Sequence, residues 1–118
     1  MNIRVECTTQ ERAVRIAHDI LDKARKGELD TWSFAEVSVD EQRQHLPCIY
    51  HDTTQIQDER KFAYFHVYQL GNQAIFEMDP MRGSNLTRDV KLWLLGRLAE
   101  MVISHYIERF VSIHFEIL

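Results

Sequence analysis

The feature that most constrains the fold is a pair of strand-like segments joined by a two-residue turn. Lys61–Leu70 and Gln73–Asp79 are both rich in aliphatic and aromatic side chains, and only Gly71 and Asn72 separate them. A two-residue connection that begins with glycine is typical of a tight β-hairpin, because glycine tolerates the positive φ that such a turn requires. The chain therefore predicts an antiparallel hairpin, against which its other elements have to pack.

Four further segments predict strands, because their apolar side chains alternate with polar ones or form short runs. They are Ile3–Cys7, Thr31–Val39, Leu46–Tyr50 and Val111–Ile117. In the second of these the apolar positions change parity, which indicates either a bulge near Ala35 or a strand buried on both faces. In the third, Pro47 restricts the strand to an edge or makes it a strand start.

The first helix is predicted between Ala13 and Ala24, where apolar residues recur at helical spacing. Thr8 and Glu11 have the spacing of an N-terminal capping box. Gly27 suits the position just after the C-terminus, where a left-handed conformation is common.

The second helix is predicted from Leu86 to Tyr106, with Ser84 or Asn85 as its N-cap. Trp93 lies on the predicted buried stripe. Gly96, inside the helix, indicates a close approach to the sheet. We therefore expect one α+β domain over residues 1–118, with two helices packed on a largely antiparallel sheet in the order β-α-β-β-β-β-α-β.

Composition and charge exclude several classes of protein. The chain is 45% hydrophobic and 27% charged, with a net charge of −4, which excludes a disordered or low-complexity chain. No apolar run approaches the roughly 20 residues that cross a bilayer, and the charged N-terminus does not fit a secretory signal. Two cysteines do not make a disulfide framework. We expect a cytoplasmic protein with no membrane segment.

Several motifs that bind cofactors or nucleotides are missing from the sequence. It contains no G-x-G-x-x-G, P-loop, G-x-S-x-G, H-E-x-x-H or paired C-x-x-C motif, so no cofactor is assigned. Nucleic acid is disfavoured as a partner by the net negative charge. The best basic positions, Arg82 and Arg88, lie close in sequence to Asp79 and Asp89.

Negative charge gathers in the middle of the chain. From residue 28 to residue 59 there are eight acids and one base, a net of −7, whereas the rest of the chain carries +3. The acids are Glu28, Asp30, Glu36, Asp40, Glu41, Asp52, Asp58 and Glu59. If these acids share a surface, their field suits a cationic partner; otherwise they form an ordinary solvated face.

In size, acidity and α+β layout the chain resembles the bacterial immunity proteins of contact-dependent growth inhibition. The resemblance implies a cytoplasmic protein that binds and neutralises a cognate toxin with a basic surface, such as a nuclease. On this interpretation the acids in predicted loops contact the partner, and two tyrosines act as aromatic anchors. The candidate partner-binding residues are Asp40, Glu41, Tyr50, Asp52, Asp58, Glu59 and Tyr64.

An alternative site lies on the strongest predicted strand. Tyr64, His66 and Tyr68 share one face of it, and His114 on the last strand could join them. Imidazole titrates near neutral pH and tyrosine can donate a hydrogen bond, so this set could serve a small enzyme or a ligand-binding pocket. The same aromatic face could instead form a homodimer contact, so both monomer and homodimer stay open, and a structural role for the histidine is the ordinary alternative.

One further pattern combines residue types that bind zinc. His45, Cys48 and His51 form an H-x-x-C-x-x-H sequence, but Pro47 and the strand-like segment around the cysteine would direct these side chains apart. We therefore assign no metal site.

Overall fold

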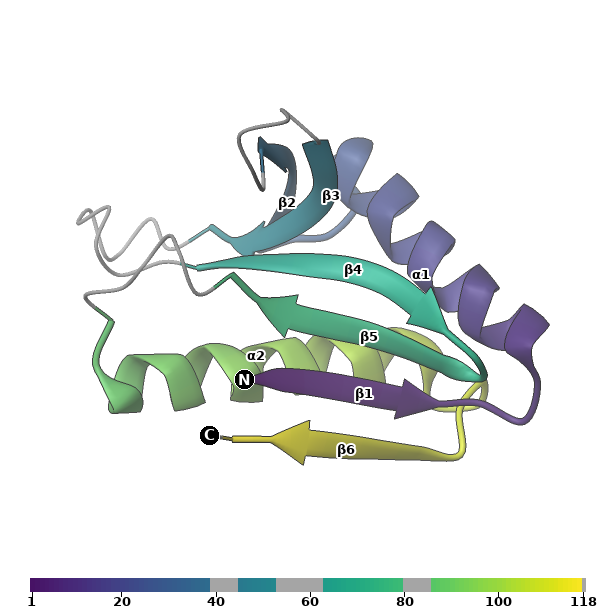
Figure 1. Ribbon diagram of the computed structural model, residues 1–118. Coiled ribbons are helices and arrows are strands. Elements are labelled where there is room, and N and C mark those ends of the chain that lie inside the picture. The colour runs from purple at the N-terminus through teal and green to yellow at the C-terminus, as the bar shows by residue number, and fades with distance from the viewer. Residues whose placement is uncertain (39–44, 53–62, 80–85, 118) are drawn as a thin grey trace.

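The computed structural model describes residues 1–38, 45–52, 63–79 and 86–117. In these residues six strands and two helices follow one another in the predicted order, which confirms an α+β fold. The elements are β1 (Asn2–Glu6), α1 (Gln10–Arg25), β2 (Trp32–Ser38), β3 (His45–His51), β4 (Tyr64–Leu70), β5 (Gln73–Met78), α2 (Arg88–Tyr106) and β6 (Ser112–Glu116) (Figure 1).

The strands form one sheet in the order β2-β3-β4-β5-β1-β6. Every pairing between neighbours is antiparallel. The N-terminal strand β1 is inserted between β5 and the C-terminal strand β6, so the two ends of the chain lie close together (Figure 1). β2 and β6 are the edge strands.

The predicted hairpin is present between β4 and β5. Leu70 pairs with Gln73, which leaves a two-residue turn, and Gly71 adopts a φ of 59°. A side chain would be strained at this φ, so glycine is required here by the turn itself.

Both helices lie on the same side of the sheet, which we call the helix face (Figure 1). The core fills the space between the two layers, because apolar residues of β1, β4 and β5 meet the apolar stripes of α1 and α2. Tyr106 of α2 is almost fully buried and its hydroxyl donates a hydrogen bond of 2.6 Å to Asp19 of α1, which joins the two helices.

The ends of α1 match the prediction at one terminus and differ at the other. The N-cap is Thr9, whose hydroxyl accepts the Arg12 N–H at 3.2 Å, so the capping box starting at Thr8 was wrong by one residue. At the C-terminus, Gly27 has a φ of 71° and donates its N–H to the Ala24 carbonyl at 3.2 Å, as predicted.

The start of α2 and the role of its glycine both differ from the prediction. Thr87 is the N-cap, with its hydroxyl accepting the Val90 N–H at 3.3 Å, rather than Ser84 or Asn85. Gly96 is exposed, and a Cβ built on it would meet nothing within 4 Å. The predicted close approach to the sheet is therefore wrong.

The pairing of β2 with β3 settles the change of parity along β2. The register runs without a bulge through Ala35, and Trp32 and Val37 are both buried although their side chains point to opposite faces. The strand is thus buried on both faces. β3 is an interior strand with Pro47 as its third residue, so the prediction of an edge strand was wrong, and Pro47 is near the strand start rather than at it. The ladder of β3 with β4 covers only Cys48–Tyr50, so Pro47 lies outside that ladder and its missing N–H removes no bond there.

Candidate functional site

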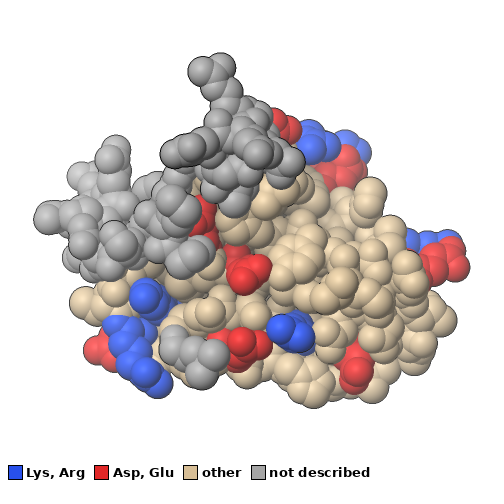
Figure 2. All heavy atoms as spheres, viewed as in Figure 1, with Lys and Arg blue, Asp and Glu red and all other residues tan. Residues whose placement is uncertain are grey.

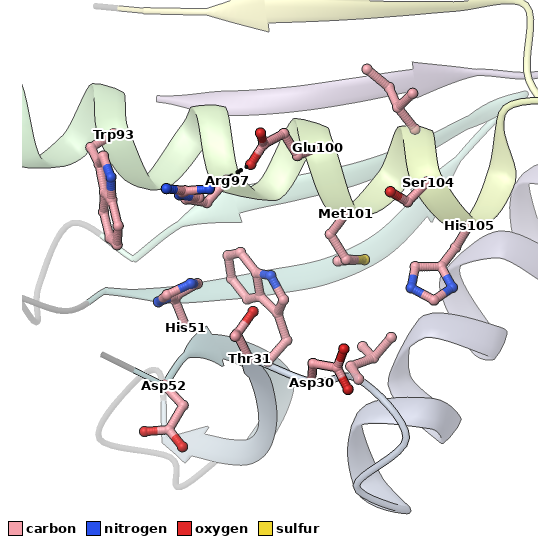
Figure 3. Close-up of a pocket in the computed structure, with 13 residues that line it drawn as sticks. Asp30, Thr31, His51, Asp52, Trp93, Arg97, Glu100, Met101, Ser104 and His105 are labelled. Atoms are coloured by element: carbon pink, nitrogen blue, oxygen red, sulfur yellow. Dashed lines mark hydrogen bonds and ion pairs between the residues drawn. The ribbon is translucent and has the colours of Figure 1, made fainter. Parts of the chain in front are cut away.

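An open groove of about 710 Å³ lies on the helix side of the molecule, between α2 and the segments that flank β2 and β3 (Figure 3). Its lining combines aromatic, acidic and basic side chains. The lining residues are Leu29, Asp30, Thr31, Trp32, His51, Asp52, Trp93, Arg97, Glu100, Met101, Ile103, Ser104 and His105.

One wall of the groove is a single side of α2. Trp93, Arg97, Glu100 and Ser104 follow one another at helical spacing, so their side chains project toward the same side (Figure 3). Trp93 is 38% exposed, which corrects the prediction that it belongs to the buried stripe. The core is filled instead by its neighbours on α2, and the indole is left to the groove.

The opposite wall comes from the segments that begin β2 and end β3. The Asp52 N–H donates a hydrogen bond of 2.6 Å to the Thr31 carbonyl, which holds these two segments together. As a result Asp30 and Asp52, 22 positions apart in the sequence, line the same groove. Both belong to the acidic segment identified from the sequence, although only Asp52 was a predicted partner-binding residue.

Aromatic rings form the end of the groove near the start of α2. The ring of His51 lies edge-on between the indoles of Trp32 and Trp93, with centroid distances of 5.2 and 5.1 Å. Burial lowers the pKa of His51, and the nearby Arg97 guanidinium lowers it further, while Asp52 opposes both. Nδ1 of His51 is buried and has no hydrogen-bond partner among the described residues.

Acidic side chains outnumber basic ones in the lining of the groove. Arg97 pairs with Glu100 at 2.9 Å and its guanidinium lies 5.5 Å from the centroid of the Trp93 ring. In the described part of the chain, neither Asp30 nor Asp52 has an ion-pair partner. The groove therefore carries an excess of negative charge beside an exposed aromatic ring, a combination that can bind an ammonium or guanidinium group.

The other predicted partner-binding residues are distributed differently. Asp40, Glu41, Asp58 and Glu59 lie outside the described residues. Tyr50 and Tyr64 are cross-strand neighbours whose ring centroids are 5.6 Å apart.

These tyrosines lie on the face of the sheet away from the helices, which we call the open face and which is defined by Tyr64, His66 and Tyr68 of β4 and their cross-strand partners. In Figure 2, where this face is toward the viewer, acidic and basic side chains are interspersed rather than gathered into one patch. The structure therefore does not place the two tyrosines in the acidic groove with Asp52.

The open face contains a row of three buried polar side chains, with His66 in the middle. The His66 Nδ1 lies 3.1 Å from the Cys48 thiol of β3, and the His66 Nε2 lies 3.4 Å from a carboxylate oxygen of Asp79, which follows β5. All three residues are buried. An imidazole between a thiol and a carboxylate can accept the thiol proton while the carboxylate stabilises the resulting imidazolium.

The alternative pocket predicted from the sequence is not brought together in one place. Tyr64, His66 and Tyr68 share the open face of β4, and the Tyr68 hydroxyl donates to Glu77 at 2.9 Å. His114 shares this face but lies on β6, three strands away, or about 14 Å at the usual strand spacing. None of these four residues lines the groove beside α2.

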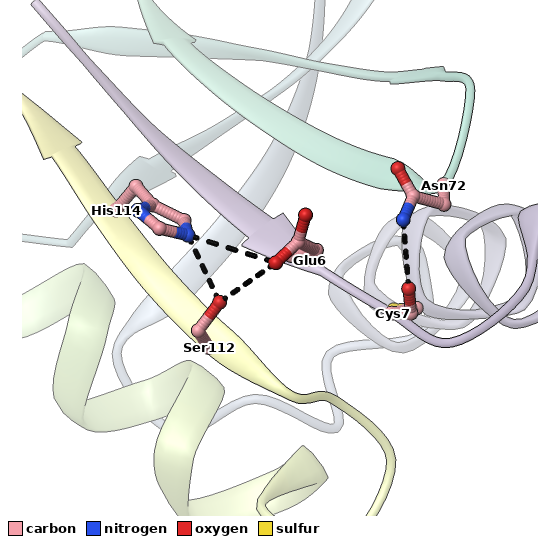
Figure 4. Close-up of polar contacts among 5 residues, drawn as sticks. All are labelled: Glu6, Cys7, Asn72, Ser112 and His114. Atoms are coloured by element: carbon pink, nitrogen blue, oxygen red, sulfur yellow. Dashed lines mark hydrogen bonds and ion pairs between the residues drawn. The ribbon is translucent and has the colours of Figure 1, made fainter.

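His114 instead belongs to a small polar cluster at the C-terminal edge of the sheet (Figure 4). Its Nε2 lies 2.9 Å from the Ser112 hydroxyl and 3.8 Å from a carboxylate oxygen of Glu6. The Ser112 hydroxyl also donates to Glu6 at 3.1 Å, so this cluster, in which His114 is exposed and the other two residues are half-buried, is satisfied locally.

The zinc-like sequence pattern does not converge in the strand that contains it. Cys48 points to the open face toward His66, whereas His51 points to the helix face between two tryptophans. In the described part of the chain, no three histidine, cysteine or acidic residues form a group that could hold a metal ion.

Two groove residues, Trp93 and Arg97, were not identified from the sequence. A tryptophan near an apolar helical stripe is ordinarily assigned to the core, and the groove forms only where α2 passes the start of β2, which the sequence does not reveal. The available signal was the run of Trp93, Arg97, Glu100 and Ser104 at helical spacing, which places polar and charged groups beside an indole.

None of the helices in the described residues has the length and apolar character needed to span a membrane. No protein-family model matches the chain, and comparisons with curated proteins and with solved structures find no similar protein or fold.

Proposed function

We propose that this protein binds and neutralises a basic protein, as an immunity protein neutralises its cognate toxin, and that the groove beside α2 receives a basic segment of that partner. The observation that carries the proposal is that Asp30 and Asp52 line one open groove with the exposed ring of Trp93. The partner would be a cytoplasmic target with an arginine- or lysine-rich surface, and a nuclease toxin has that chemistry.

The groove suits a basic side chain for two physical reasons. Carboxylates at an interface attract a cationic partner and accelerate encounter, while an indole supplies both apolar contact area and a cation–π surface. Tryptophan is also among the residues that most often dominate binding energy at protein interfaces. Asp30, Asp52 and Trp93 provide these properties within one groove.

The contacts that Arg97 makes within the groove support this assignment. Its guanidinium lies over Trp93 and pairs with Glu100, the kinds of contact that an arginine of the partner would make. Because Arg97 also offsets part of the negative charge, removing it should strengthen binding of a basic partner. Truncating an interface residue usually weakens binding, so stronger binding after removal of Arg97 is the opposite of the usual effect.

The test begins with the tagged protein as bait for proteins from its native cells, washed at low and then raised salt. A basic polypeptide retained at equal stoichiometry is then expressed alone and together with the wild-type protein. The proposal expects that polypeptide to arrest growth alone and the wild-type protein to restore growth. Retention of only neutral or acidic proteins, or a basic protein with no growth effect, contradicts it.

Matched charge variants then locate the binding surface. Asp52→Lys is expected to weaken binding at least about tenfold, mainly through slower association at low salt. Glu36→Lys makes the same change of charge at an exposed position of β2 outside the groove, and is expected to have a smaller effect. Equal losses in the two variants would show a general effect of net charge and would remove the groove from the proposal.

A second candidate function is cysteine-dependent chemistry, favoured by the position of His66 between Cys48 and Asp79. The distances of 3.1 and 3.4 Å would let His66 take the thiol proton while Asp79 orients and stabilises the imidazolium. On this alternative the nucleophile is the Cys48 thiolate, and the substrate class is an activated carbonyl or another small electrophile.

Alkylation of the native protein tests this alternative, with Cys7 as an internal control. Cys7 is also buried, and burial raises its pKa. A nucleophilic Cys48 should react with iodoacetamide at least about tenfold faster than Cys7, and His66→Ala should abolish the difference. If Cys48 is labelled only after unfolding, the row is a structural hydrogen-bond network and the enzyme alternative fails.

A further inference from the structure

We propose that two copies of this chain form a symmetric dimer through the edge strand β6, which pairs antiparallel with β6 of the second copy so that Phe115 lies opposite the partner's Phe115. The inference rests on the backbone groups of β6 that have no strand partner among the described residues, on its exposed apolar side chains, and on the polar side chains that this register brings together.

The hydrogen bonds of β1 identify which backbone groups of β6 face outward. At the end of β1, Cys7 donates its N–H to the Asn72 carbonyl at 2.9 Å, on the β5 side. At the other end, Met1 accepts the Met78 N–H at 3.1 Å, also from the β5 side. Alternate residues of an antiparallel strand direct their N–H and C=O groups toward opposite neighbouring strands. The odd-numbered residues of β1 therefore bond to β5, and the even-numbered ones bond to β6.

The alternation carries over to β6. The even-numbered residues of β1 pair with Ser112, His114 and Glu116, so these three residues direct their N–H and C=O groups toward β1. Ile113 and Phe115, and Ile117 directly after the strand, therefore direct theirs away from the sheet. They form a row of donors and acceptors at its edge.

This edge also carries exposed apolar side chains. Phe115 is 50% exposed and Ile117 is 39% exposed, and Val111 just before the strand is 62% exposed. β6 contains neither lysine nor proline, the residues that commonly keep edge strands from pairing. With this composition, and with no strand beside it in the part of the chain that the structure describes, the outer edge of β6 is a template for another strand.

The polar groups and the shapes of the β6 side chains favour one register with itself. With Phe115 opposite the partner's Phe115, His114 lies opposite the partner's Glu116 and Ile113 lies opposite the partner's Ile117. Each favourable pair occurs twice by symmetry. A register centred on His114 would instead place two imidazoles opposite each other.

The geometry of the helix layer fits this arrangement. An antiparallel self-pairing has its twofold axis perpendicular to the sheet, so the helices of both copies stay on the same face. α2 contacts β1, so the two α2 helices would be separated by about three strand spacings, or about 14 Å. This separation exceeds the usual 8 to 10 Å between packed helices. The Phe115 and Ile113 side chains on the helix face would fill the space between them.

The first test is the mass in solution over a range of concentrations, measured by light scattering or sedimentation equilibrium. The chain mass is 14.0 kDa, so a dimer has twice that mass, 28.0 kDa. We expect wild-type dimers at tens of micromolar and a monomer for Phe115→Lys, with at least about tenfold weaker self-association. Leu70→Lys, at a position 64% exposed on the β4–β5 hairpin, is the matched control and should stay dimeric. A monomeric wild type, or equal effects of the two lysines, overturns the proposal.

The second test fixes the register while keeping Phe115. Under oxidation the double variant Ile113→Cys with Ile117→Cys is expected to form a covalent dimer, because each new thiol lies opposite the other on the second copy. Ile113→Cys alone should not cross-link, since its copies would be about four residues out of register. The native cysteines are both buried. No cross-link in the double variant, or an equal yield in the single variant, contradicts this pairing. Asp52→Lys should leave the dimer intact, so failure of the groove and failure of the dimer are distinguishable.

Discussion

The thiol of Cys48 lies 3.1 Å from Nδ1 of His66, although the two residues are 18 positions apart. The register of β3 with β4 places them directly opposite each other on the open face. Both side chains are buried, so each supplies a polar partner that the other could not obtain from solvent.

The energetic consequence of this pair can be measured by a double-mutant cycle. Cys48→Ala should lower the free energy of unfolding by about 1 to 3 kcal/mol, because it creates a small cavity and leaves one imidazole nitrogen without this partner. His66→Leu should also destabilise. The two effects should depart from additivity by at least about 0.5 kcal/mol in urea unfolding. Additive losses would mean that the close approach contributes no coupling.

Tyr106 is expected to stabilise the contact between the helices through Asp19. Burial raises the pKa of Asp19, but hydrogen bonds from Tyr106 and Lys23 outweigh this and lower it overall. Tyr106→Phe should therefore cost about 1 to 2 kcal/mol at pH 7. A lowered carboxyl pKa stabilises the fold above the ordinary value of about 3.9 and less below it, so the difference should shrink toward pH 3.

The control for this prediction is Tyr68→Phe, which removes a hydroxyl that donates to Glu77 at a residue that is 40% exposed. It should cost only a few tenths of a kcal/mol, because solvent replaces the partner. Equal costs for the two variants, measured by urea unfolding at pH 7 and pH 3, would contradict a special role for the buried pair.

Gly96→Ala is expected to stabilise the protein. The position is in α2, is exposed, and has open space where a Cβ would lie, so the gain in helix propensity of about 0.5 to 1 kcal/mol should be realised. Gly71→Ala is the opposite case, because its φ of 59° strains any side chain, and should cost about 1 kcal/mol. Thermal unfolding of both variants checks the signs, and a destabilised Gly96→Ala would contradict the open surroundings of this glycine.

His51 is expected to make stability depend on pH in the neutral range. Burial, followed by Arg97, lowers its pKa in the folded protein. On acidification below about 6.5 the unfolded chain therefore takes up the proton first, and the free energy of unfolding falls. Urea unfolding between pH 7.5 and pH 5.5 should show this decline, and His51→Gln should flatten it. His18→Gln, at an exposed position of α1, is the control. An unchanged slope in His51→Gln would contradict the prediction.

Local sequence signals were sufficient for the order of elements and for the sites of strongest backbone constraint. The turn at Gly71 and Asn72 and the left-handed position at Gly27 are both present as predicted, because each depends on a few adjacent residues. The helix starts were less well defined. Several residues that can serve as an N-cap lie close together before each helix, Thr8 and Thr9 before α1 and Ser84, Asn85 and Thr87 before α2, and residue type alone does not distinguish them.

The sequence by itself determined an α+β chain with a hairpin, two helices and an acidic middle segment, since these follow from periodicity, turn residues and charge, all of which act over short distances. Only the tertiary structure decided that β1 lies between β5 and β6, that Asp30 and Asp52 share a groove with Trp93, and that Cys48 meets His66. The physical reason is that strand order and register depend on how all the apolar faces are buried together. No single segment of the sequence contains the information about this combined burial.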